Sequence, residues 1–215
     1  MGSIRKLLFF ILVSGFLIFV LAGIVAFGAY FFTSRREVSL SAWSDPIAHI
    51  ETKKVMPALA LLPLAGVPSS EAFSQALEAG ELESAYAILV FSLDLSERER
   101  VGSSLLLARR YAEVGNATKA KLCYRQASAI ATLSPVLSDF IRADAYLQVG
   151  HGLANLREQG EAKLNYDQAY TIALYSLYLK KAHQKSILDK LVPAYKAIGE
   201  NQRAEQALYQ SAALN

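Results

Sequence analysis

The stretch LLARRYAEVGNATKAKLCYRQA, residues 106–127, contains the pattern that decides the fold of this 215-residue chain. On both sides of Gly115 its apolar and small residues recur at the three- and four-residue spacings of a helix. Gly115 suits the left-handed backbone that ends a helix, and Ala120 is small enough for an antiparallel helix to pack closely beside the first. The stretch therefore predicts two antiparallel helices joined by a tight turn.

The same pattern occurs three more times in register. In the quoted stretch its positions are Leu107, Ala108, Tyr111, Ala120, Tyr124 and Ala127. The next unit consists of Val149, Gly150, Leu153, Ala162, Tyr166 and Ala169. An equal displacement further on are Leu191, Val192, Tyr195, Gly199, Ala204, Leu208 and Ser211. Upstream, at a smaller displacement, are Ala72, Phe73, Ala76, Gly80, Ala85, Leu89 and Ser92. Four units predict a repeat domain of about four helix pairs over residues 70–215.

This order of a large apolar residue, a small one, an aromatic, a turn, Ala, an aromatic and Ala resembles the tetratricopeptide repeat. The resemblance implies an all-α fold, in which antiparallel helix pairs stack into a right-handed superhelix. It also implies that the first helix of each pair lines a concave face that binds peptides or partner helices. The paired Lys and Asn of the subset that grips chaperone C-termini are missing, so that partner is not expected.

Several features depart from the standard repeat. The spacing from Leu107 to Val149, and again to Leu191, is greater than the usual period of about 34 residues, so the helices are expected to be longer by about two turns per pair. The turn of the third unit is expected at residues 158–160, around Gly160. Ser134 and Pro135 are expected to be the N-cap and first residue of the next helix. Pro193 is expected to kink the first helix of the last unit.

Residues 7–32, LLFFILVSGFLIFVLAGIVAFGAYFF, form a run without any charged side chain. As a helix this run is ~39 Å long, more than the ~30 Å hydrocarbon core of a bilayer. A signal peptide has a shorter apolar region and an Ala-x-Ala-like cleavage site, and this run is longer and has no such site. A core helix has a polar stripe, which this run also does not have. We therefore expect a single-pass transmembrane anchor over residues 1–34, in contact with the bilayer through residues 7–32.

The membrane orientation is nearly balanced, since Arg5 and Lys6 precede the segment and Arg35 and Arg36 follow it. Large C-terminal domains cross membranes largely regardless of charge, which slightly favours the repeats on the non-cytoplasmic side. Residues 35–69 are interpreted as a linker with a short membrane-proximal helix or turn. Within the anchor, small residues such as Ala22 and Ala26 allow contact with another transmembrane helix.

The sequence offers candidates for partner binding on the first helices of the pairs. These candidates are Leu105, Arg109, Glu113, Leu147, Gln148, His151, Asn155 and Lys196. They form either a binding groove or an ordinary solvated helix face, and the sequence leaves both interpretations open.

No catalytic constellation is recognisable. The three histidines, His49, His151 and His183, are far apart and have no metal-ligand spacing, and phosphate-binding loops and nucleophile motifs are missing. Cys123 is expected to be a small buried residue, and the tyrosines are expected to serve packing. With a net charge of +3, the chain has no nucleic-acid footprint. We expect no enzyme activity, no cofactor and no metal.

Two functions fit these features. The first is a membrane-anchored scaffold that binds a protein partner, as an accessory or assembly factor of a membrane complex. The alternative is a permanent structural subunit of such a complex, whose transmembrane helix packs against other subunits. The sequence does not identify the partner.

Overall fold

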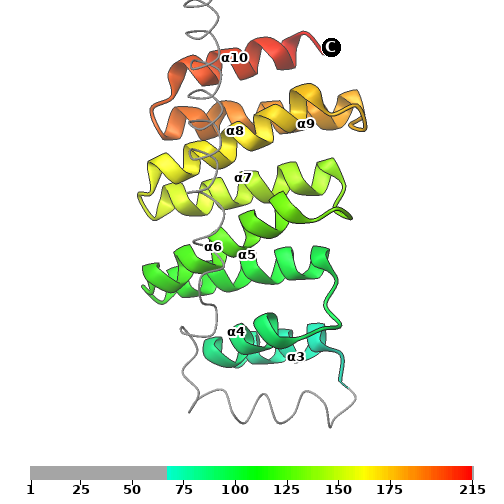
Figure 1. Cartoon of the computed structure of the whole chain (residues 1–215). Helices are drawn as coiled ribbons and strands as arrows, with labels where there is room; N and C mark the ends of the chain where they lie inside the picture. Colours follow the sequence, from blue (N-terminus) through cyan, green and yellow to red (C-terminus); the bar gives the residue numbers. More distant parts are fainter. Residues whose placement is uncertain (1–66, 215) are drawn as a thin grey trace, which may run out of the picture. The chain divides into compact units, whose positions relative to one another are not determined.

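The computed structural model describes residues 67–214, which are helical and contain no strand. The helices are α3 (Ser69–Glu78), α4 (Leu82–Phe91), α5 (Glu97–Glu113), α6 (Ala117–Leu133), α7 (Asp139–Asn155), α8 (Gln159–Tyr175), α9 (Lys181–Ala197) and α10 (Asn201–Ala212). Each odd-numbered helix packs against the helix that follows it, and consecutive pairs pack against each other (Figure 1). We call α3, α5, α7 and α9 the first helices and α4, α6, α8 and α10 the second helices.

The repeat register expected from the sequence is confirmed. Helices α5, α7 and α9 begin at equal intervals, at residues 97, 139 and 181, and α6, α8 and α10 begin at the same intervals, at residues 117, 159 and 201. All five helices from α5 to α9 have 17 residues, whereas α3 and α4 have ten each. Helix α4 is thus about two helical turns shorter than α6, which accounts for the smaller displacement of the first unit.

The repeated positions form one continuous hydrophobic core. Tyr111, Tyr124, Tyr166 and Tyr195 are all buried, together with the small residues at the helix crossings. Ala72 and Val192 are partly buried, and Leu208 is half exposed, because no further first helix covers α10 within the described residues. The expectation that most tyrosines serve packing is thus confirmed for the repeat positions.

Two glycines of α7 allow its close packing against both neighbours. A methyl group at Gly152 would overlap the ring of Tyr124 on α6, and one at Gly150 would overlap the ring of Tyr166 on α8. Glycine in the middle of α7 lowers helix stability. The close packing of two aromatic rings against the helix backbone offsets this cost. These glycines set the spacing at the centre of the stack.

The turns within the pairs share one backbone geometry. Gly80, Gly115 and Gly199 have φ values of 76°, 78° and 81°. Arg157 occupies the same position in the third pair, with φ 64°. The expectation of a turn at residues 158–160 was therefore wrong: the turn is in register, and Gly160 lies inside α8, which begins at Gln159.

The start of α7 also differs from the expectation. Its N-cap is Ser138, whose hydroxyl accepts a hydrogen bond from the Ile141 amide at 3.4 Å. Ser134 instead follows the last residue of α6, and its Oγ accepts from the amides of Val136 and Leu137. Ser134 and Pro135 therefore belong to a loop and not to a helix start. Pro193 lies inside α9, which continues to Ala197.

Ion pairs join neighbouring second helices. Lys121 lies 2.8 Å from Glu158, and Arg125 makes a two-pronged contact with Glu161 at 2.5 and 2.8 Å. The Arg125 guanidinium holds the pKa of the Glu161 carboxyl below its usual range. Because these pairs are partly exposed, each contributes little stability, and their main effect is to fix the register between pairs.

Candidate partner-binding face

The first helices contact one another directly, α5 with α7 and α7 with α9. One side of the stack is therefore lined by first helices, and the candidate binding residues belong to these helices. Arg109 lies on α5, and Gln148 and His151 lie on α7. Lys196 lies near the end of α9.

A ladder of polar side chains crosses three first helices. Arg109 Nη2 donates to Gln148 Oε1 at 2.6 Å, and Gln148 Nε2 donates to Asp144 Oδ2 at 2.6 Å. Lys190 Nζ on α9 donates to the other oxygen of Asp144 at 3.3 Å. Two of the expected residues are thus brought together, and Asp144 and Lys190 complete the ladder.

His151 lies beside this ladder and contacts a buried tyrosine. Its Nδ1 is 3.1 Å from the hydroxyl of Tyr166, and the two rings meet edge to face at 5.5 Å. Desolvation of the imidazole and the charge of Lys190 both lower the pKa of His151 below its usual value. The neutral imidazole is therefore favoured near neutral pH, as a hydrogen-bonding partner of Tyr166.

Glu113, Asn155 and Lys196 lie at or near the C-terminal ends of the first helices, where their side chains are exposed. Glu113 pairs with Arg110 at 2.9 Å on the surface of α5. These three residues lie near the turns, one at the end of each of the helices α5, α7 and α9.

Leu105 and Leu147, in contrast, do not line an accessible groove. They are 4% and 2% exposed and belong to the hydrophobic core. The two leucines occupy equivalent positions on α5 and α7. The first helix of the following pair packs against each of these helices, α7 against α5 and α9 against α7. The expectation that these two leucines face a partner is corrected accordingly: of the eight candidates, the six polar residues are the accessible ones.

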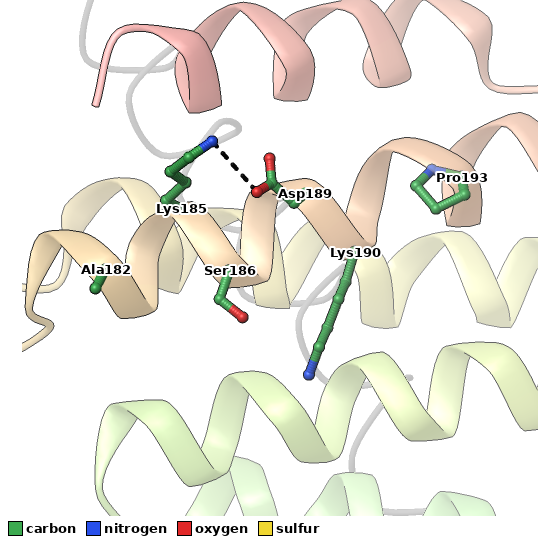
Figure 2. A pocket seen from close by; sticks show the side chains of 6 residues that line it. All are labelled: Ala182, Lys185, Ser186, Asp189, Lys190 and Pro193. Carbon is green, nitrogen blue, oxygen red and sulfur yellow. Dashed lines mark hydrogen bonds and ion pairs between the residues drawn. The ribbon is translucent and has the colours of Figure 1, made fainter. Parts of the chain in front are cut away.

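The equivalent position on α9 explains a hollow that the sequence did not reveal. Asp189 takes the place of Leu105 and Leu147, and Lys185 takes the place of the buried Val101 and Ala143. Figure 2 shows Lys185 directed at Asp189, 3.4 Å away, along the exposed side of α9. The hollow is lined by Ala182, Lys185, Ser186, Asp189, Lys190 and Pro193.

Ser211 of α10 completes this polar end. Its hydroxyl donates to Asp189 and accepts from Lys185, and it replaces the buried alanines Ala127 and Ala169 of the preceding pairs. The Ser211 hydrogen bond and the Lys185 charge lower the pKa of Asp189. Polar residues at core positions are typical of the outer face of a terminal repeat. A change from Leu to Asp at equivalent positions was the available sequence signal.

Two expectations about reactive groups concern the described residues. Within residues 67–214 no group of three or more His, Cys, Asp or Glu side chains is arranged to hold a metal ion. Cys123 is fully buried, as expected, and burial raises the pKa of its thiol to about 12, so the unreactive thiol form is favoured.

The expected transmembrane anchor, residues 1–34, the linker up to residue 66 and His49 lie outside the described residues. No helix among the described ones is long and apolar enough to cross a bilayer. None of the known protein families, curated proteins or solved structures matches this chain.

Proposed function

We propose that this protein is a membrane-anchored scaffold. Residues 7–32 hold it in a bilayer, and its repeat stack, of the tetratricopeptide type, binds a protein partner as an accessory or assembly subunit of a membrane complex. The observation that carries the proposal is the joining of a long uncharged apolar run to a stack that presents polar side chains along its first helices.

The physical advantage of the anchor is local concentration. A domain confined to a membrane meets membrane-bound partners at a far higher effective concentration than a freely diffusing one. A stack of this kind can act without a catalytic group, since its role is to hold its partners close together.

The polar ladder supports recognition of an acidic group. Arg109 is exposed and its partner in the ladder, Gln148, is neutral. A carboxylate on a partner forms a charge-assisted pair with a guanidinium, which is roughly twice as strong as a neutral hydrogen bond. Such a carboxylate can displace the Gln148 amide from Arg109, and the freed amide still has Asp144 as an acceptor.

Site-specific photo-crosslinking in native membranes tests the proposal. A photoreactive residue at Arg109 of the full chain is expected to give a discrete protein adduct. The same residue at Gln168, exposed on the second helix α8, is expected to give none. Equal crosslinking from both positions contradicts binding by the first-helix face.

A charge reversal adds a second readout. Arg109→Glu is expected to abolish co-purification of the partner in mild detergent, whereas Gln168→Glu is expected to preserve it. If Arg109→Glu leaves a complex intact and crosslinks arise only from the apolar N-terminal segment, the protein is a permanent structural subunit held by its transmembrane helix.

A further inference from the structure

The connections between helices lie on two opposite edges of the stack. The turns at Gly80, Gly115, Arg157 and Gly199 form one edge, which we call the turn edge. The connections between pairs, residues 92–96, 134–138 and 176–180, form the other edge, which we call the loop edge (right-hand side of Figure 1).

The loop edge concentrates the exposed apolar side chains. Of the twelve large hydrophobic residues that are exposed within residues 67–214, seven belong to these loops or to the helix residue just before each loop. They are Phe91, Leu93, Leu133, Val136, Tyr175, Leu177 and Tyr178. Leu93 is 96% exposed, Leu177 is 93% exposed and Tyr178 is 90% exposed. Scattered apolar residues are ordinary on a surface, whereas their concentration along one edge indicates an interaction site.

The fold does not need these side chains. In the first two loops another residue closes the core, since Leu95 and Leu137 are each 6% exposed. The ends of the preceding helices are also satisfied by other groups: Arg100 donates to the carbonyls of Leu89 and Ser92, and Arg142 donates to the carbonyl of Ser134. In the third loop Leu179 packs against the core. Leu93 and Leu177, which are almost fully exposed, thus contribute little to the packing of the stack.

The chain reaches the stack at this same edge. Val67 and Pro68 precede α3, whose first residue lies on the loop edge because all first helices run in the same direction (Figure 1). Residues 33–66 connect this point to the uncharged segment. The loop edge is therefore the edge of the stack at which the chain arrives from that segment.

We propose that the loop edge contacts the lipid bilayer, with the loop 176–180 inserted at the level of the headgroups. This inference rests on the proposed anchor. The loop reads Leu177-Tyr178-Leu179 followed by Lys180 and Lys181. Tyrosine at the interface, leucine below it and lysine toward anionic headgroups is the arrangement that bilayers favour.

The charges of the other two loops are compatible with such contact. Asp94 accepts a hydrogen bond from the Ser69 amide at 3.0 Å, and Glu99 is held by the capping box with Ser96. These carboxylates are engaged within the stack. Val136 is 74% exposed at the tip of the middle loop, which carries no basic residue of its own. Exposed apolar side chains occur in all three loops, whereas the two neighbouring lysines, Lys180 and Lys181, occur only at the third.

Fluorescence quenching in lipid nanodiscs tests the inference on the full chain. A cysteine is introduced at Leu177, at Val136 or, as the control, at Thr118, which is exposed on the turn edge. The native Cys123 is buried, so it is expected not to react with the dye. The discs contain phosphatidylcholine with a minority of phosphatidylglycerol. Brominated acyl chains report contact with lipid, and iodide reports contact with water.

We expect the dyes at positions 177 and 136 to lose about half of their emission with brominated lipid, since interfacial groups lie roughly 5–10 Å into the headgroup and acyl boundary. The dye at position 118 is expected to respond only to iodide. Co-elution of the chain with the discs reports the anchor separately.

Three outcomes overturn the inference. If the chain co-elutes with the discs but iodide quenches positions 177 and 118 equally, the loop edge faces water while the anchor stands. If position 177 is shielded from both quenchers, a protein surface covers the edge instead of lipid. If the chain does not co-elute, the anchor fails and the lipid contact fails with it.

Discussion

The turn edge and the loop edge connect the same kind of antiparallel helices by different means. On the turn edge a single left-handed residue reverses the chain, and Gly80, Gly115 and Gly199 supply it in three pairs out of four. On the loop edge five residues are used each time, with a buried leucine in the first two loops and arginine caps in the same two. Backbone conformation thus explains the first edge, and side-chain contacts explain the second.

The two edges also differ in which of their side chains are needed for folding. The left-handed position, Arg100 and Leu95 each have a structural task. The exposed residues Leu93 and Leu177 have none, although leaving a leucine side chain in water costs more free energy than leaving a polar side chain there. Residues that are apolar without a structural reason are the ones that point to a surface with another role.

A large effect is expected at the side-chain cap of the loop edge, second only to the loss of the buried Leu95 side chain. Arg100→Met removes hydrogen bonds to the carbonyls of Leu89, Ser92 and Leu95. Because the three carbonyls are left without their charged donor, the free energy of unfolding is expected to fall by about 2–3 kcal/mol. Urea unfolding in mild detergent, followed by helical circular dichroism, measures this. The control Arg98→Met, on an exposed residue of the same helix, is expected to change stability by less than about 0.5 kcal/mol. Equal losses would contradict the capping role.

The next effect is at the backbone of the turn edge. Gly115→Ala places a side chain at φ 78° and is expected to cost about 1–2 kcal/mol. Gly102→Ala, inside α5 with open space around the added methyl group, is expected to stabilise by about 0.5–1 kcal/mol. The same unfolding measurement compares the two. Two changes of the same sign would show that backbone conformation does not control this edge.

A smaller effect of opposite sign is expected at the irregular turn. Arg157→Gly relieves a left-handed non-glycine residue and is expected to stabilise by about 0.5–1 kcal/mol. Gly160→Ala, within α8 and with open space, is expected to stabilise similarly. Thermal melts of both variants measure the two shifts. Loss of stability in Gly160→Ala with no change in Arg157→Gly would place the turn at residues 158–160.

The sequence was sufficient where small and aromatic residues recur in register. Ala120, Tyr124 and their equivalents predict the helix pairs, because a regular period repeated along the chain leaves few alternatives. The third turn was misplaced because Arg157 adopts the left-handed conformation that glycine adopts elsewhere, while Gly160 offers a false signal three residues later. Ser134 was misassigned because Ser-Pro resembles a helix start, whereas Ser138 caps α7 without that mark.

The candidate binding face was only partly predictable for a related reason. Periodicity identifies which residues of a first helix point away from its own partner helix, and Arg109 and Gln148 were identified in this way. Periodicity does not give the packing of one first helix on the next, which buries Leu105 and Leu147. That packing depends on the angle between pairs, which is a property of the assembled stack.

We infer that the exposed apolar side chains of the loop edge serve contact with another surface and not folding. The most direct test is the urea unfolding of the triple variant Leu93→Ser, Val136→Ser and Leu177→Ser in mild detergent, with Leu95→Ser as the buried control. The triple variant is expected to unfold within about 0.5 kcal/mol per site of the unchanged protein. Leu95→Ser is expected to lose roughly 2–5 kcal/mol. A loss of about 2 kcal/mol at each of the three exposed sites, the value for a buried side chain, would contradict the claim.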